Sequence, residues 1–137
     1  MTYYDEWLRR VPTNIIQDSL WGFETYRKAL FLSDLAWEDC QKLLADPRGK
    51  GIAWQLMDSA GSVSANIEEG YGRGFGKDYA RFLRIALGSA REARGWYYRG
   101  RSVWDDKVVK HRMMLIDEII AGLVTTADQQ RHLPEKP

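Results

Sequence analysis

Hydrophobic residues recur at alternating steps of three and four through most of this chain, which is the spacing of one face of an α-helix. The pattern predicts four long helices, and segments containing proline or glycine separate the first three of them. The helices are expected over residues 20–45, 52–69, 77–100 and 106–127. Because the connections are short, we expect an all-α, up-down-up-down four-helix bundle.

Each predicted helix has a seam of residues expected to face the core. The first seam comprises Tyr26, Leu30, Ser33, Trp37, Cys40 and Leu44. The second comprises Ala53, Leu56, Ala60, Val63 and Ile67, and the third Tyr79, Phe82, Ala86, Ala90, Ala93 and Tyr97. The fourth comprises Val109, Met113, Ile116, Ile120, Leu123 and Ala127. The last helix has further apolar residues beside its seam, which favours burial against two neighbours, with a second subunit as one candidate.

The chain has 137 residues, which fits one domain with a single core. We expect residues 20–127 to form the bundle and residues 1–19 to form an N-terminal arm with a short amphipathic turn. This arm should lie on the bundle or on a neighbouring subunit. Residues 128–137 are predicted to be a disordered, solvated C-terminal tail.

The single cysteine, Cys40, excludes an internal disulfide and favours a reducing compartment. Its place in the first seam predicts a buried, unreactive thiol. No apolar run is long enough to span a membrane, and the N-terminus lacks the apolar segment of a secretory signal. The expected location is cytoplasmic.

Charge is distributed unevenly although the net charge is only +1. Residues 77–101 carry seven basic and two acidic side chains, so the third helix is strongly basic. The candidate nucleic-acid-binding residues are Arg73, Lys77, Arg81, Arg84, Arg91 and Arg94. Like charges at helical spacing repel one another, so something acidic should offset them. Acidic residues of the preceding helix, a neighbouring subunit and a polyanion are the alternatives.

Alternating glycines join the second and third helices in the segment GYGRGFG, residues 70–76. A phosphate-binding loop is excluded because a helix precedes the segment and because Asp78 stands where a serine or threonine is required. A dinucleotide-binding turn also needs a preceding strand. We interpret the segment as a helix end and chain reversal, with Gly70 in the left-handed C′ position.

Small residues crowd the second helix around its seam. Gly61 costs about 1 kcal/mol relative to alanine in a helix interior, so we expect close packing to compensate for it. Glu69 stands near the C-terminus of this helix, the unfavourable end of the helix dipole for an anion, and should have a cationic partner. The candidate partners are Arg73, Arg81 and Arg84.

Three stretches carry a resemblance to a known family: AGSVSANIEEG (60–70), Gly72-Arg73, and FLRIALGS (82–89) followed by Glu92. They are similar to bacterial four-helix bundle proteins, also called 23S rRNA intervening-sequence proteins. Accessory proteins of diversity-generating retroelements share this fold. The resemblance covers about residues 20–125 and departs at Glu68, where the family usually has alanine. The extra charge argues against a nucleic-acid surface centred on the end of the second helix.

The resemblance implies a left-handed bundle, often assembled as a ring-like homopentamer, with no enzymatic activity. Retroelement members of the family are thought to bind nucleic acid and a reverse transcriptase through basic surface. Structural roles are expected for the motif residues Asn66, Glu69, Gly70, Gly88, Ser89 and Glu92.

Two functions are consistent with these features. The first is binding of RNA or DNA, or a reverse-transcriptase accessory role, through the arginine-rich face of the third helix. Bidentate phosphate contacts would come from arginine, and Trp96, Tyr97 and Tyr98 are candidate stacking surfaces. The alternative is a protein–protein interaction scaffold with no nucleic-acid role. A solvated or ion-paired arginine face is the purely structural explanation.

An enzyme is not expected, and no catalytic residue, metal ligand or cofactor is assigned. The two histidines, His111 and His132, are distant in sequence. No Glu-x-x-His pair is present to indicate a di-iron site.

Overall fold

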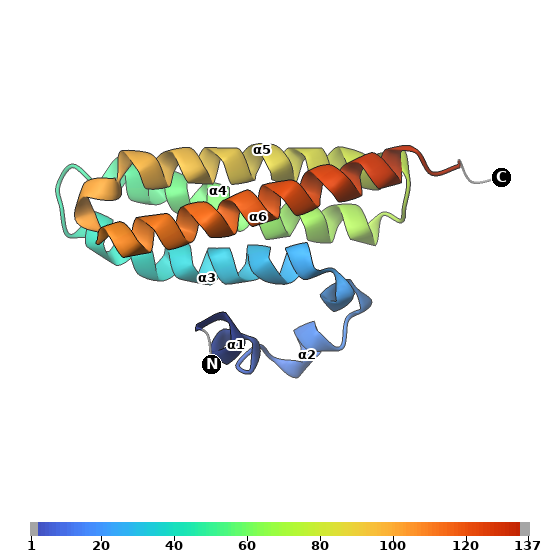
Figure 1. The fold of residues 1–137 in the computed structure, drawn as a ribbon, viewed down its shortest axis with the longest axis horizontal. Helices are drawn as coiled ribbons and strands as arrows, with labels where there is room; N and C mark the ends of the chain where they lie inside the picture. The colour runs from blue at the N-terminus through green and yellow to red at the C-terminus, as the bar shows by residue number, and fades with distance from the viewer. Residues whose placement is uncertain (1–2, 135–137) are drawn as a thin grey trace.

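A computed structural model describes residues 3–134, which form helices joined by turns and contain no strand. Four long helices account for most of this part of the chain (Figure 1). They are α3 (Glu24–Leu44), α4 (Lys50–Gly72), α5 (Lys77–Arg99) and α6 (Asp106–Arg131). The shorter helices are α1 (Tyr3–Leu8), α2 (Thr13–Ile16), η1 (Ser19–Gly22) and η2 (Arg101–Val103). The prediction of an all-α chain with four long helices is confirmed.

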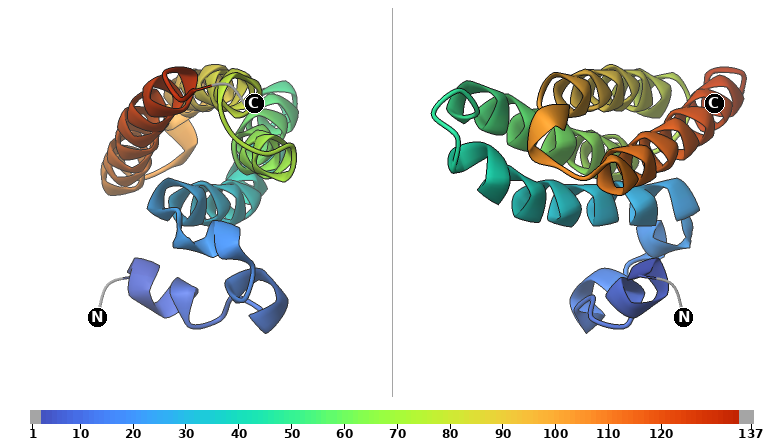
Figure 2. Two further views of the ribbon diagram at one scale, coloured as in Figure 1. Left: turned by 90° about the vertical axis from the view of Figure 1, so that its right-hand side faces the viewer. Right: turned by 60° about the vertical axis from the view of Figure 1, so that its left-hand side comes forward.

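The four long helices, called the four-helix core below, pack around shared apolar residues. Contacts join α3 to α4, α4 to α5, α5 to α6 and α3 to α6. Figure 1 shows that successive helices run in alternating directions, and Figure 2 shows them from two further sides. The segment before α3 lies outside this core, against α3.

Two of the predicted seams agree closely with the observed core. All five seam residues of α4 are fully buried. On α5, every predicted residue is buried except Phe82, which is half-buried, and Leu83 joins them. Both seams contain alanines, two on α4 and three on α5, which allow the helix backbones to approach closely.

The predicted seam of α3 is wrong at two of its largest residues. Trp37 is 70% exposed and Leu44 is 41% exposed. The residues of α3 that face the other three helices are Tyr26, Ala29, Leu32, Ala36, Cys40 and Leu43. Phe31 and Leu35 are also buried, because the N-terminal segment covers them. A helix buried on two sides has no single apolar stripe, so its large residues do not identify the core side.

The seam of α6 is likewise displaced. Val109, Met113 and Ile120 are only partly buried, whereas Arg112, Leu115 and Ile119 are buried beside the correctly predicted members. The helix also continues to Arg131, so the first residues of the predicted disordered tail are helical. The last three residues of that tail lie outside the described part of the chain.

Gly70 does not occupy the predicted left-handed position, because α4 continues through it to Gly72. The positive φ values of this connection belong to Gly74 (118°) and Gly76 (83°). Gly70 is required for another reason: a Cβ atom there would lie 2.6 Å from Cβ of Phe82 on α5. The close packing expected at Gly61 is not found, since its nearest neighbour would lie 4.0 Å from an added Cβ.

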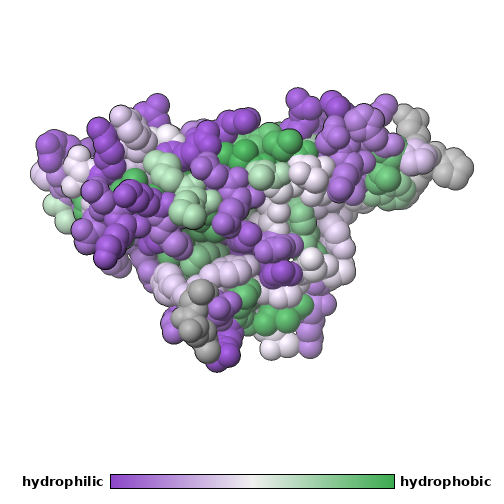
Figure 3. Space-filling model, in the orientation of Figure 1, coloured by the Kyte–Doolittle hydropathy of each residue, from purple (hydrophilic) through white to green (hydrophobic). Residues whose placement is uncertain are grey.

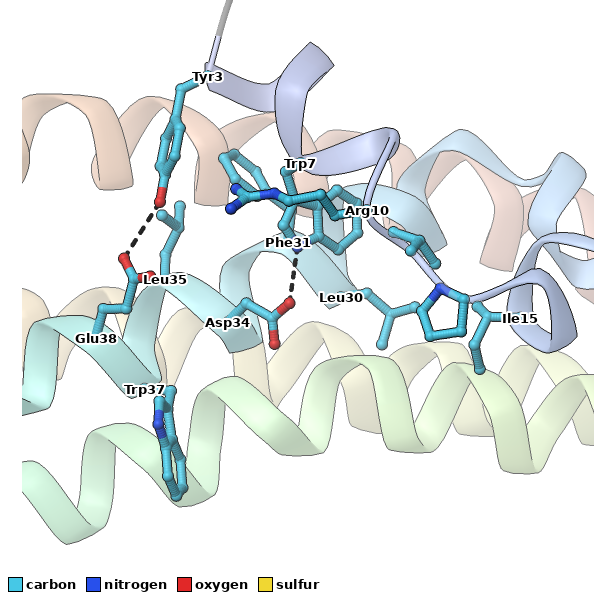
Figure 4. Close-up of a pocket in the computed structure, with 12 residues that line it drawn as sticks. Tyr3, Trp7, Arg10, Ile15, Leu30, Phe31, Asp34, Leu35, Trp37 and Glu38 are labelled. Atoms are coloured by element: carbon cyan, nitrogen blue, oxygen red, sulfur yellow. Dashed lines mark hydrogen bonds between the residues drawn. The ribbon is translucent and has the colours of Figure 1, made fainter.

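The N-terminal segment lies on α3 of its own chain, one of its two predicted placements. Trp7 Nε1 donates to Asp34 Oδ2 at 2.7 Å, and the Tyr3 hydroxyl donates to Glu38 Oε2 at 3.2 Å (Figure 4). A cavity of about 410 Å³ remains between the segment and α3. Trp37 points away from the N-terminal segment in the same view.

None of the helices formed by residues 3–134 is long and apolar enough to cross a membrane.

Candidate nucleic-acid interface

The basic residues of α5 lie on the side of the helix that faces away from the core. The core side is fixed by the buried alanines at positions 86, 90 and 93. At 100° per residue, positions 77, 84 and 91 fall on the opposite side. Lys77, Arg84 and Arg91 are indeed exposed, as is Arg81. The predicted outward direction of these cations is therefore correct.

Three of the five predicted arginines have carboxylate partners. Arg73 pairs with Glu69 at 3.0 Å, Arg81 with Asp78 at 3.4 Å and Arg94 with Asp117 of α6 at 2.8 Å. The first of these pairs confirms one of the predicted partners of Glu69. All three pairs are at least 40% exposed on both sides, so each contributes only about 0–1 kcal/mol. Such pairs leave the arginines available to a competing anion.

Arg84 and Arg91 differ from these three. Within residues 3–134, neither side chain has an ion pair or a hydrogen bond. Between them lies Gly88, which is exposed and has no atom within 4 Å of an added Cβ. The packing role expected for Gly88 is therefore not found. The two guanidinium groups border an open strip of helix backbone.

Stacked arginine–aromatic pairs lie at both ends of α5. At its start, the guanidinium carbons of Arg73 and Arg81 lie 5.0 Å and 4.5 Å from the centre of the Phe82 ring. At its end, Arg99 lies 4.7 Å from Trp96 and Arg101 lies 4.1 Å from Tyr98, again measured to the ring centre. Arg99 and Arg101 were absent from the predicted set, although their positions three residues after an aromatic side chain could have indicated them.

The remaining motif residues have local roles or none that the structure explains. Asn66 Nδ2 donates to the Ser62 carbonyl of its own helix at 2.8 Å. Glu92 Oε2 accepts from Trp96 Nε1 at 3.1 Å. Ser89 is half-buried and nothing in the structure explains it. Glu68, the departure from the family pattern, accepts from the Tyr26 hydroxyl at 2.6 Å.

A buried polar cluster joins three helices and was missed by the sequence prediction. Arg112 of α6 donates to both carboxylate oxygens of Asp39 on α3, from Nε at 2.8 Å and from a terminal nitrogen at 3.0 Å. The Tyr97 hydroxyl of α5 donates to Asp39 Oδ2 at 2.6 Å. Trp104 Nε1 donates to the Asp39 carbonyl at 3.0 Å. Tyr97 is therefore a core residue, and its prediction as a stacking surface is wrong.

Burial governs protonation in this cluster. Burial and the negative charge of Asp39 raise the pKa of Tyr97 well above its usual value, so its hydroxyl stays protonated and donates. Arg112 also hydrogen-bonds His111 Nδ1 at 2.7 Å. Partial burial and the neighbouring guanidinium lower the pKa of His111, so the neutral ring that accepts this bond is favoured. Within residues 3–134, no three His, Cys, Asp or Glu side chains are grouped so that they could hold a metal ion.

The comparisons with known proteins identify the family. Residues 22–125 match the family model described as 23S rRNA-intervening sequence protein. This chain belongs to that family. The matched region of the 23S rRNA-intervening sequence proteins contains α3, α4 and α5 entire and most of α6, and it excludes α1 and α2. Neither the curated proteins nor the solved structures include a match to the chain.

The side of the molecule drawn in Figure 3 has mixed polarity. Hydrophilic side chains cover much of the side drawn in Figure 3, with separate hydrophobic patches between them. The outward side of α5 differs from such a surface in two ways. Arg84 and Arg91 have no ion-pair or hydrogen-bond partner within residues 3–134, and the helix backbone at Gly88 is open.

Proposed function

We propose that this 23S rRNA-intervening sequence protein binds RNA, without catalysing a reaction, through the outward face of α5. The observation that carries the proposal is the pair of exposed arginines, Arg84 and Arg91, that have no partner among the described residues. Guanidinium groups bind phosphate oxygens in a bidentate manner, and two unpaired ones on one side of a helix form a phosphate-binding row.

The geometry of this row suits a sugar–phosphate backbone. Arg84 and Arg91 are seven residues apart, so they lie two turns or about 10.5 Å apart along the helix axis. Gly88 has no side chain on one flank of the line between them, which allows a ligand backbone to approach the helix closely there. The family description, which names a 23S rRNA intervening sequence, agrees with an RNA-related role.

The finer parts of the proposal rest on the family resemblance. We infer that the four-helix core is an up-down-up-down, left-handed bundle located in the cytoplasm, and that several copies assemble into a ring, with a homopentamer as the specific proposal. A ring would multiply the basic row and so strengthen weak single contacts. A reverse transcriptase is the protein partner that the retroelement relatives suggest, and DNA remains an alternative nucleic acid.

A salt titration tests RNA binding. The apparent affinity for a fluorescently labelled 20-nucleotide single-stranded RNA should fall as salt rises, because phosphate contacts release counterions. The double variant Arg84→Gln/Arg91→Gln should reduce the logarithmic salt slope by about 1.4, since each phosphate contact to a single strand contributes about 0.7.

The charge-matched control is Arg9→Gln/Lys42→Gln, which removes two exposed cations on α3 and the segment before it. This control should leave the slope within experimental error. Absence of binding at low salt, or an equal effect of both double variants, would exclude the α5 face as the binding site.

A second candidate function, a protein-interaction scaffold, is favoured by one specific observation. Trp37 of α3 and Trp54 of α4 are 70% and 65% exposed, although tryptophan is a common anchor of protein interfaces. The two helices are in contact close to these rings. Cys40, one turn after Trp37, donates to the carbonyl of Ala53, the residue before Trp54. If these rings form an interface between copies, Trp37→Gln/Trp54→Gln should lower the mass measured by sedimentation equilibrium. An unchanged mass would remove this candidate as a self-association surface.

A further inference from the structure

Residues at heptad spacing form one continuous row along the outward side of α5. Lys77, Arg84, Arg91 and Tyr98 are each seven residues apart. A helix drifts only about 20° per seven residues, so all four lie on one side of α5. The row therefore consists of three cations followed by one aromatic ring at the C-terminal end of the helix.

Tyr98 differs from the other aromatic residues near it. Its side chain is 57% exposed, whereas Tyr97 is fully buried and Trp96 is half-buried. Phe82, near the other end of α5, is half-buried. Tyr98 is thus the aromatic side chain of this row that a planar ligand can reach.

Arg101 holds the Tyr98 ring in a defined arrangement. One terminal nitrogen of Arg101 donates to the Tyr98 carbonyl at 2.9 Å, and its guanidinium lies 4.1 Å from the ring centre. A positioned ring with a stacked guanidinium presents flat surfaces for a nucleobase and N–H groups for the adjoining phosphate. An isolated exposed tyrosine would offer neither the orientation nor the charge.

We propose that Tyr98 and Arg101 form a base-stacking site that makes α5 select single-stranded RNA over duplex RNA. This inference rests on the proposed function, because Arg84 and Arg91 must first position the phosphate backbone along the same row. A duplex offers its phosphates to the arginines but keeps the faces of its bases stacked on one another. A single strand can satisfy both parts of the row, with phosphates on the arginines and a splayed base on Tyr98.

The experiment compares two RNA probes by fluorescence anisotropy at one salt concentration: a labelled 20-nucleotide single strand and the same sequence as a blunt duplex. The wild-type protein should bind the single strand more tightly. The Tyr98→Ala variant should weaken single-strand binding about tenfold, within the range measured for loss of one stacked base, and change duplex binding less than twofold. Tyr98→Phe keeps the ring and should restore single-strand binding to within about twofold of wild type.

Failure of this inference can be distinguished from failure of the proposed function. If Arg84→Gln/Arg91→Gln reduces binding but Tyr98→Ala does not, the stacking site is excluded while the phosphate row stands. Equal weakening of both probes by Tyr98→Ala, or tighter binding of the duplex by the wild type, also overturns the inference. If the wild type binds neither probe at low salt, both the RNA-binding function and the stacking site are excluded. Because Tyr98 is exposed, far-UV circular dichroism should show unchanged folding in both tyrosine variants.

Discussion

Loss of Arg112 should destabilise the protein strongly, because this residue neutralises the buried carboxylate of Asp39. The Arg112 side chain is 11% exposed and that of Asp39 is 8% exposed. The substitution Arg112→Leu would leave this carboxylate without its counter-charge in the core. Tyr97 and Trp104 donate to the same residue, so their positions depend on Asp39 as well.

The expected magnitude follows from this burial. Removing one partner of a buried ion pair costs about 3–5 kcal/mol, a large part of the roughly 5–15 kcal/mol by which a domain of this kind is stable. Tyr97→Phe removes one donor at 2.6 Å but leaves both nitrogens of Arg112 in place. That change should cost about 1.5 kcal/mol, the low end of the range for a hydrogen bond to a charged group.

The assay is urea denaturation followed by far-UV circular dichroism, with the denaturant slope checked for constancy among variants. A double-mutant cycle of Asp39→Leu and Arg112→Leu in the Tyr97→Phe background avoids an unpaired tyrosine hydroxyl. Each single change should cost several kcal/mol, but together they should cost less than either one, because no charge is then left buried.

The matched control is Arg131→Leu on the same helix. Arg131 pairs with Asp128 at 2.9 Å, but both side chains are more than half exposed, so this loss should cost about 0–1 kcal/mol. A cost of Arg112→Leu no larger than that of this control would contradict the role of Arg112 as the counter-charge of Asp39. Additive costs of the two changes in the cycle would contradict it as well.

Two further predictions concern packing and pH. Gly70→Ala should destabilise the protein by about 1–3 kcal/mol, because the added methyl group overpacks against α5. The added methyl group of Gly88→Ala meets no neighbour, so this change should stabilise the helix by up to about 1 kcal/mol. Thermal unfolding of both variants checks this difference. The lowered pKa of His111 means that folding favours its neutral form, so the stabilisation it provides is present above pH 6.5 and is lost as the pH falls through its folded pKa. Urea denaturation at pH 7.5 and pH 5 should therefore show a smaller acid-induced loss in His111→Gln than in wild type; an identical loss in both would contradict the assignment.

The sequence predicted best those helices whose buried faces are simple. On α4, the residues at steps of three and four lie on the buried side, and each of Ala53, Leu56 and Ile67 is buried as expected. On α3, the N-terminal segment covers a second apolar side, and nothing in the sequence tells which of Leu35 and Trp37 faces protein and which faces solvent. Hydrophobic spacing reliably predicts that a segment is helical. It predicts which side of the helix faces the core only when the helix has a single apolar side.

The candidate site was predictable in composition and direction but only partly in its pairing. The periodicity of α5 places its arginines outward, and that prediction holds. The pairs of Arg73 and Arg81 are local, whereas the pairing of Arg94 with Asp117, 23 positions further along the chain, depends on a contact between helices. The Asp39–Arg112 pair spans 73 positions, and neither residue belongs to a predicted seam.

The buried cluster and the outward row of α5 contain neighbouring residues of one helix, Tyr97 and Tyr98. Successive residues of a helix point about 100° apart, so fixing the direction of Tyr97 fixes that of Tyr98. Tyr97 is fixed by its bond to the Asp39 carboxylate, which Arg112 in turn holds from α6. A change at Arg112 that leaves the helices folded should therefore loosen the direction of the Tyr98 ring and weaken single-stranded RNA binding while leaving the salt slope set by the arginines unchanged.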